Sequence, residues 1–134
     1  METKMLNNPS IVVAMMQDKF NGLDHEELWG IFVGLRNEQI ACKMLSSGGW
    51  TSTTIDLRQI FSVALENKAV GIILIHNHLS GSPKPSISDL NVTDRIRAAA
   101  RILDITLIDH IIIAGEQYYS FADEVIRTIK QDKK

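Results

Sequence analysis

Apolar and polar residues alternate along the chain at two spacings, one typical of helices and one typical of strands. Apolar side chains recur every three or four residues after Pro9 and Ser10, whereas the segment that ends at Ile75 is almost continuously apolar. In chain order, the pattern predicts a helix over 9–22, a hairpin of strands over 28–35 and 39–45, a loop over 46–52, a helix over 56–67, a strand over 70–75, a polar loop over 76–85, a helix over 87–103, strands over 105–114 and 118–121, and a terminal helix from Asp123.

This order of elements predicts an α/β fold, a single layered domain with a mixed β-sheet flanked by helices. The chain has 134 residues, of which 45% are hydrophobic and 22% charged, so it is long enough for one ordinary core. We expect a flexible N-terminus over 1–8, the folded domain over 9–128 and a solvated tail over 129–134.

Composition narrows the classes of function. The net charge of −2 offers no basic excess for binding a nucleic-acid backbone. The only cysteine, Cys42, cannot form an internal disulfide and excludes Cys-rich zinc sites, so a metal would need His and carboxylate ligands. The apolar runs are too short to cross a membrane and the first residues do not resemble a signal peptide, so we expect a cytoplasmic protein without membrane contact.

Two histidines mark the candidate site. His76 and His78 follow a buried strand, and because side chains at i and i+2 point to one side, the two imidazoles should converge. A loop then leads to Asp89, which can return as a third ligand. Two His and one carboxylate are a typical catalytic zinc set, in which the fourth position holds water.

A purely structural interpretation covers part of this pattern. Ser86 followed three residues later by Asp89 matches a helix capping box, and Asn77 suits any turn. Capping does not account for two histidines at a strand end, so the metal site is the favoured interpretation.

The same residues resemble a known family. His76-x-His78, seven further residues, Ser86, two more and Asp89 resemble the JAMM signature of JAB/MPN metalloproteases, and HNHLSGSPKPSISD over 76–89 resembles its bacterial RadC branch. The resemblance extends over about 20–128 and implies a JAB/MPN-like, cytidine-deaminase-like architecture. One departure is Leu79, where the branch usually has Pro, which affects the stiffness of the loop rather than a ligand.

The resemblance implies a mechanism. Zn²⁺ would be held by His76, His78 and Asp89, an upstream glutamate would accept a proton from water, and Ser86 would donate a hydrogen bond to the developing oxyanion. Two alignments compete for the glutamate: the pattern of eukaryotic relatives selects Glu27, and that of RadC relatives selects Glu26. We choose Glu26, with Glu27 as the alternative base.

Three functions follow as hypotheses. The first is a zinc hydrolase that cleaves an amide or isopeptide bond in a protein or peptide substrate. The alternatives are a metal-dependent factor in DNA repair or DNA metabolism, which charge does not support but the family allows, and a catalytically silent scaffold. Full-length RadC proteins also carry an N-terminal helical region without a counterpart in this sequence, so we expect any DNA contact of that region to be missing. The sequence predicts no oligomeric state.

Three residues outside the motif carry weaker expectations. His110, in a strand beside Asp109, is expected to bond to a neighbour, in preference to supporting the metal. Trp29 is expected in the core, and Trp50 is expected to cover the loop around it.

Overall fold

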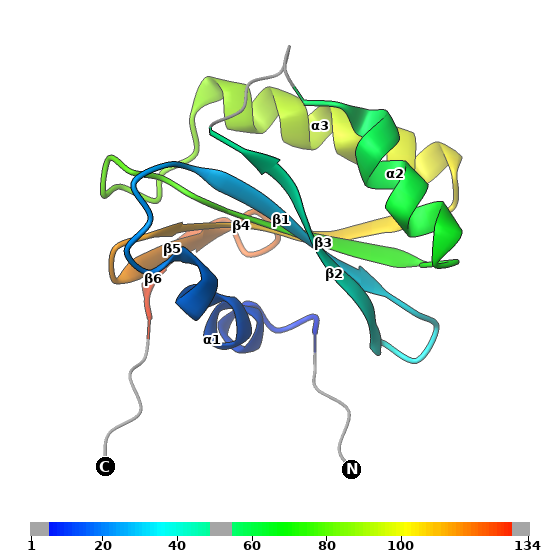
Figure 1. Cartoon of the computed structure of the whole chain (residues 1–134), viewed down its shortest axis with the longest axis horizontal. Helices are drawn as coiled ribbons and strands as arrows, with labels where there is room; N and C mark the ends of the chain where they lie inside the picture. Colours follow the sequence, from blue (N-terminus) through cyan, green and yellow to red (C-terminus); the bar gives the residue numbers. More distant parts are fainter. Residues whose placement is uncertain (1–5, 49–54, 130–134) are drawn as a thin grey trace.

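A six-stranded sheet forms the centre of the fold, with its strands in the order β2-β1-β3-β4-β5-β6 (Figure 1). The computed structural model describes residues 6–48 and 55–129. In these residues the elements are helices α1 (Pro9–Phe20), α2 (Leu57–Glu66) and α3 (Ile87–Ile102), and strands β1 (Glu27–Val33), β2 (Gln39–Ser47), β3 (Gly71–Asn77), β4 (Thr106–Ala114), β5 (Gln117–Ser120) and β6 (Val125–Thr128). Strands β3 and β4 are parallel and the other neighbours antiparallel, which confirms the predicted mixed sheet.

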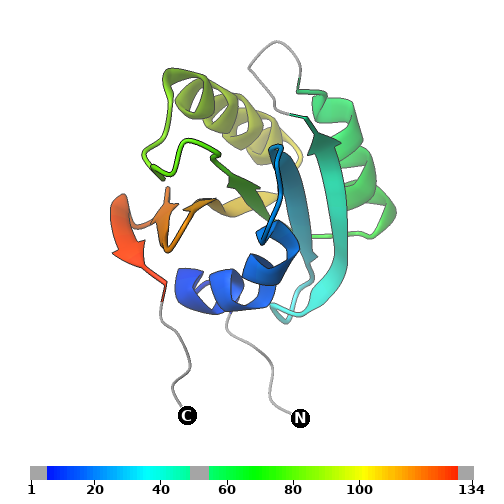
Figure 2. The same ribbon diagram turned by 60° about the vertical axis from the view of Figure 1, so that its left-hand side comes forward.

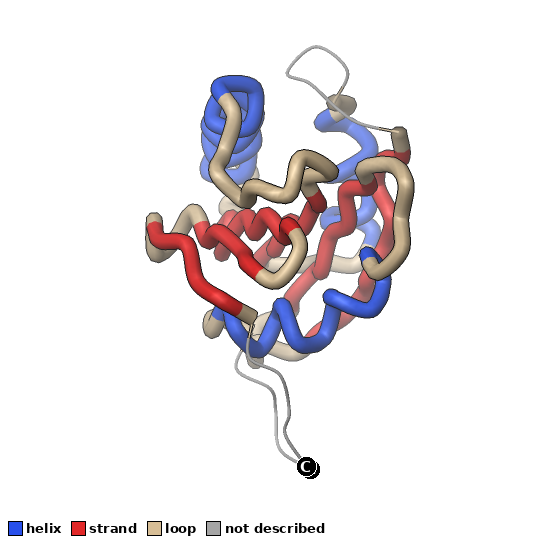
Figure 3. The backbone as a smooth tube through the Cα atoms, turned by 90° about the vertical axis from the view of Figure 1, so that its left-hand side faces the viewer, coloured by secondary structure: helices blue, strands red, loops and turns tan. Residues whose placement is uncertain are grey.

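Helices cover both faces of this sheet, α1 on one side and α2 with α3 on the other (Figures 2 and 3). Strand β3 lies between the two layers and is buried along its whole length. Its side chains alternate, so that Ile73 and Ile75 pack in the core under α1, whereas Ile72 and Leu74 pack in the core under α2 and α3. A near-continuous apolar run is what a strand covered on both faces requires.

The predicted terminal helix from Asp123 is wrong. Strand β6 occupies that region and pairs antiparallel with β5. Glu124 adopts a positive φ of 58°, which turns the chain back on itself, and the β-branched residues Val125, Ile126 and Thr128 favour an extended backbone.

Smaller differences concern the ends of elements and single side chains. The predicted loop over 46–52 starts later, because β2 continues to Ser47, and Trp50 lies outside the described residues. Trp29 is half-buried rather than in the core, and the ammonium group of Lys19 lies 4.6 Å from its ring centroid. Leu6, ahead of α1, is buried in the core under that helix. Among the described helices, none has the length and apolar character needed to span a bilayer.

The double-sided burial of β3 leads to a test of stability. Ile73→Ala should lower the free energy of unfolding by about 2–5 kcal/mol, because it opens a cavity in the core. Ile102→Ala makes the same change at a side chain that is 82% exposed and should cost less than about 0.5 kcal/mol. Urea unfolding of both variants measures the difference, and equal losses would contradict the layered core.

Candidate metal centre

Three side chains predicted as ligands come together at the carboxyl end of β3 and the start of α3. One ligand atom from each of His76, His78 and Asp89 lies within 4.8 Å of the other two. Nε2 of His76 is 3.2 Å from Oδ1 of Asp89, and Nε2 of His78 is 3.0 Å from Oδ2 of the same carboxylate. Both imidazoles therefore direct the same ring nitrogen towards one acidic group.

The start of α3 fixes the position of that acidic group. The backbone N–H of Asp89 donates to the Ser86 hydroxyl at 3.0 Å, and the Asp89 carboxylate accepts from the backbone N–H of Ser86 at 2.8 Å. This is a complete capping box. Capping and metal ligation, which the sequence presented as competing interpretations of Asp89, use different electron pairs of the same carboxylate and are compatible.

The other ring nitrogen of each histidine is also held. Nδ1 of His78 donates to the backbone carbonyl of Ser82 at 3.0 Å, and Nδ1 of His76 lies 2.8 Å from Nε2 of His110. Because His78 donates from Nδ1, its neutral form has a lone pair on Nε2, which faces a carboxylate oxygen. Nε2 of His78 and Oδ2 of Asp89 would then be two acceptors 3.0 Å apart, and they require a proton or a cation between them. The three side chains therefore fit a metal ion.

The charges of the group reinforce one another. Burial by itself raises the pKa of Asp89, but the close imidazoles of His76 and His78 outweigh it and hold this pKa well below its usual range. The hydrogen bond to Asp89 raises the pKa of His78. Burial lowers the pKa of His76, so this fully buried imidazole favours its neutral, ligating form. Asp89 thus offers an anionic oxygen beside the neutral imidazole of His76.

The two candidate bases face opposite sides of the sheet. Leu28 pairs with His76 in the β1–β3 ladder and packs under α2 and α3, so Glu26, two residues earlier, lies on the same side as the histidines. A carboxylate oxygen of Glu26 is 3.5 Å from the backbone nitrogen of Leu79, the residue after His78. Its negative charge also contributes to raising the pKa of His78, after the larger effects of Asp89, burial and the Ser82 carbonyl.

Glu27 is engaged elsewhere. Its carboxylate accepts from Nε1 of Trp29 at 2.9 Å and lies 2.7 Å from Nε2 of His25. The hydrogen bond from Trp29, followed by that from His25, lowers the pKa of Glu27 against the opposing effect of burial. Trp29 packs against the core under α1, on the other side of the sheet, and a carboxylate held in this way is a weaker base.

Asn77, between the two histidines, was expected only to form a turn. Its side-chain carbonyl accepts from the backbone N–H of Glu27 at 2.8 Å, and its amide donates to the carbonyl of His25 at 3.1 Å. These bonds attach the segment that contains Glu26 to the end of β3. The feature of the sequence that could have indicated this role of Asn77 is a polar residue in the last position of a buried strand.

His110 is bonded to a neighbour, as expected, but that neighbour is the candidate ligand His76. His110 thus contacts a candidate metal ligand directly. Thr93, on α3, approaches the other nitrogen of His110 at 2.6 Å and was not singled out from the sequence.

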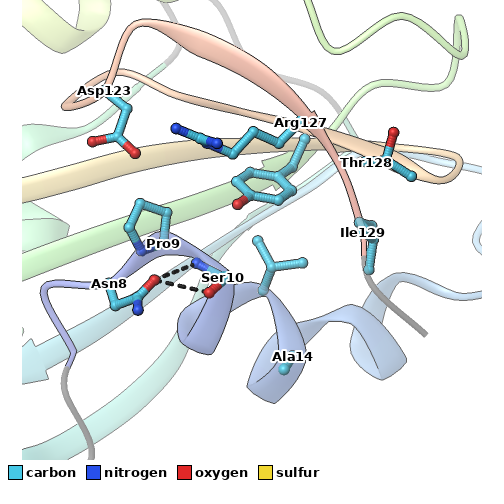
Figure 4. A pocket seen from close by; sticks show the side chains of 10 residues that line it. Asn8, Pro9, Ser10, Ala14, Asp123, Arg127, Thr128 and Ile129 are labelled. Atoms are coloured by element: carbon cyan, nitrogen blue, oxygen red, sulfur yellow. Dashed lines mark hydrogen bonds between the residues drawn. The ribbon is translucent and has the colours of Figure 1, made fainter. Parts of the chain in front are cut away.

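A separate cavity of about 650 Å³ lies between the start of α1 and strands β5 and β6 (Figure 4). Its lining includes Asn8, Ser10, Asp123 and Arg127. None of the three candidate ligands lines it, so the cavity is distinct from the histidine and aspartate cluster.

Comparison with known proteins supports the resemblance seen in the motif. Residues 6–126 match the family described as RadC-like JAB domain. A UPF0758 protein of Flavobacterium johnsoniae is 40% identical over 126 residues, which cover 94% of this chain and 55% of that protein. A UPF0758 protein of Herminiimonas arsenicoxydans is 35% identical over 119 residues, or 89% of this chain and 53% of that protein.

A third relative is the UPF0758 protein YfjY of Escherichia coli, 38% identical over 105 residues that cover 78% of this chain and 66% of that protein. The chain spans about half the length of the first two relatives. Since the family match covers nearly all described residues and contains all three candidate ligands, the chain belongs to the RadC-like JAB domain family.

Proposed function

We propose that the protein is a zinc-dependent hydrolase of the JAMM type that cleaves an amide or isopeptide bond. The observation that carries the proposal is the shared orientation of His76 and His78. Each directs Nε2 to Asp89 while its Nδ1 contacts another group, which is how histidines that bind a metal are usually held.

Zinc suits this donor set better than Mg²⁺ or Ca²⁺, which prefer oxygen ligands. Three protein ligands leave a position for water, and bound zinc supplies the Lewis acidity that lowers the pKa of this water to roughly 7. The chain has one cysteine, Cys42, which lies in β2, so thiolate ligands do not compete for the same ion.

Glu26 is the proposed general base. It is not among the three candidate ligands, yet it lies on their side of the sheet and beside the backbone of the loop that follows His78. A base in this position can accept a proton from water and return it to a leaving amine. Glu27, bound to Trp29 and His25, is the less suitable alternative.

Ser86 is the proposed oxyanion donor. Its hydroxyl oxygen already accepts from the backbone of Asp89, which leaves its single proton free to be donated. The residue is exposed to solvent at the start of α3, where a substrate carbonyl has access. A positioned donor of this kind stabilises the charge that develops on the attacked carbonyl oxygen.

A protein or peptide is the proposed substrate class. Cleavage of DNA is the competing function suggested by the family name, but the overall charge is −2 and Lys84 is the only basic residue between His76 and Asp89. Metal-dependent nucleases generally use clusters of carboxylates around hard cations, and the group found here has one.

The proposed metal site predicts a defined zinc content. The purified protein should bind one zinc ion per chain, and His78→Ala or Asp89→Asn should leave it sub-stoichiometric after dialysis. Asp89→Asn keeps a side-chain oxygen for the helix cap, so its loss of zinc is separable from loss of fold. His25→Ala, which changes a histidine outside the group, should retain zinc. Metal analysis by mass spectrometry provides the measurement, and stoichiometric zinc in Asp89→Asn would exclude that carboxylate as a ligand.

The base is tested by two matched substitutions. Glu26→Gln should lower kcat by about 10²–10⁴-fold with zinc content unchanged, because it removes the proton acceptor and preserves volume. Glu27→Gln should remain near the wild-type rate.

The assay uses zinc-loaded protein with peptide and isopeptide libraries, and with single- and double-stranded DNA in parallel. Chelator-sensitive cleavage of DNA without a peptide product would overturn the proposed reaction.

The two roles of Ser86 can be separated because glycine caps helices well. Ser86→Ala should lower the free energy of unfolding by about 1 kcal/mol and Ser86→Gly by only a few tenths. If the hydroxyl also stabilises the oxyanion, both variants should lose about 10²–10³-fold in kcat. Full activity in Ser86→Gly would show that Ser86 only caps the helix.

A further inference from the structure

A continuous line of side-chain contacts runs from the candidate metal centre into the core. Nε2 of His76 lies 3.2 Å from Asp89, Nδ1 of His76 lies 2.8 Å from Nε2 of His110, and Nδ1 of His110 lies 2.6 Å from the hydroxyl of Thr93. All three distances are within contact range for polar groups, and the last two are hydrogen bonds. The line connects β3, β4 and α3 behind the ligands.

The two histidines in this line are held rigidly. His76 and His110 have no exposed surface and Thr93 is 1% exposed. The ring of Phe121 stacks on His110 with an interplanar angle of 5° and a centroid distance of 4.7 Å. The backbone N–H of His110 donates to the Asp109 carboxylate at 2.7 Å, and the Ser120 hydroxyl donates to the same group at 2.6 Å. His110 therefore has little freedom to turn its nitrogen away from His76.

Proton counting restricts what this line can do. Full burial disfavours the charged imidazolium, so each of the two rings carries one N–H. In a hydrogen bond between two neutral imidazoles, one nitrogen must donate and the other must accept. The nitrogen that carries the proton of His76 therefore determines the nitrogen that carries the proton of His110. The Thr93 hydroxyl is compatible with either tautomer of His110, because it can donate or accept a hydrogen bond by rotation.

With one N–H on each ring, two arrangements satisfy the hydrogen bonds between His76, His110 and Thr93. In one, Nε2 of His76 carries its proton and faces Asp89 at 3.2 Å, Nε2–H of His110 donates to His76, and the Thr93 hydroxyl donates to His110. In the other, both hydrogen bonds are reversed: Nδ1–H of His76 donates to His110, and Nδ1–H of His110 donates to Thr93. The second arrangement alone leaves a lone pair on Nε2 of His76, which ligation of a metal requires.

We propose that His110 and Thr93 are positioning residues that fix the ring of His76 and accept its Nδ1 proton when Nε2 ligates a metal, and that metal binding reverses the direction of the hydrogen bonds from His76 to Thr93. The inference rests on the metal site proposed above, and it adds a coupling between that site and residues on β4 and α3. Replacement of either residue should weaken metal binding without removal of a ligand.

Nitrogen NMR of the full chain tests the reversal directly. The sequence contains four histidines, so ¹⁵N-histidine labelling gives few signals, which single substitutions assign. Without metal, we expect the protons of His76 and His110 on Nε2; with one equivalent of zinc, we expect both on Nδ1. If zinc binds and the proton of His110 stays on the same nitrogen, the coupling is wrong. If zinc does not bind to the wild-type protein at all, the proposed metal site itself fails.

Substitutions at Thr93 test the positioning role with matched changes. Thr93→Val keeps the shape and removes the hydroxyl, so zinc affinity should fall about tenfold, as is typical for partners of metal-binding histidines. Thr93→Ser restores the hydroxyl and should return the affinity to within about twofold of wild type. Ile96→Val, at a buried position on the same helix, should destabilise the fold without a change in zinc affinity. Competition with a chromophoric chelator measures all three.

His110→Phe keeps an aromatic ring beside Phe121 and removes both nitrogens. Zinc affinity should fall by about 10–100-fold, and the visible spectrum of the Co²⁺-loaded protein should change because the His76 ligand is no longer fixed. Wild-type affinity and spectrum in this variant would overturn the proposal. Where His110→Phe does not fold, the Thr93 pair and the NMR experiment decide the question without it.

Discussion

The carboxylate of Asp89 is the group on which the arrangement of the site depends. It closes the first turn of α3 through the bond from the Ser86 backbone and lies within 3.2 Å of both imidazoles. A carboxylate enclosed in this way would be costly without partners, since only 5% of its side-chain surface is exposed. The hydrogen bonds and the neighbouring imidazoles offset that cost, so the carboxylate that caps the helix also holds the two histidines together.

The sheet positions the residues that meet at Asp89. Strand β3 is covered on both faces, and its end delivers His76 to the side where α3 begins. Pairing with β1 brings Glu26 to the same side and leaves Glu27 on the other, while pairing with β4 brings His110 behind His76. The site therefore combines residues of β3, β4 and α3 with Glu26, which directly precedes β1, and a core that has no direct role in the proposed chemistry holds them.

The sequence predicted that the candidate ligands come together because their pattern is local: an alternating pair at a strand end and a capping signature that starts ten residues after His76. It placed the mixed sheet and most helices for the same reason. It did not identify Thr93 or the contact of His110, because these depend on how β3, β4 and α3 are aligned, and the β3–β4 pairing contains an irregularity between Ile72 and Ile73. Strand β6 was mistaken for a helix because all four of its residues are exposed, so no buried periodicity was present to distinguish the two forms.

The central claim is that one zinc ion lies among His76, His78 and Asp89, and a crystal of the zinc-loaded protein measured at the zinc absorption edge tests it most directly. The account predicts one strong anomalous peak about 2.0–2.2 Å from Nε2 of each histidine and from one oxygen of Asp89. Nδ1 of His76 should remain in contact with His110. A peak at other residues, or crystals of zinc-treated protein without a peak at this group, would contradict the account.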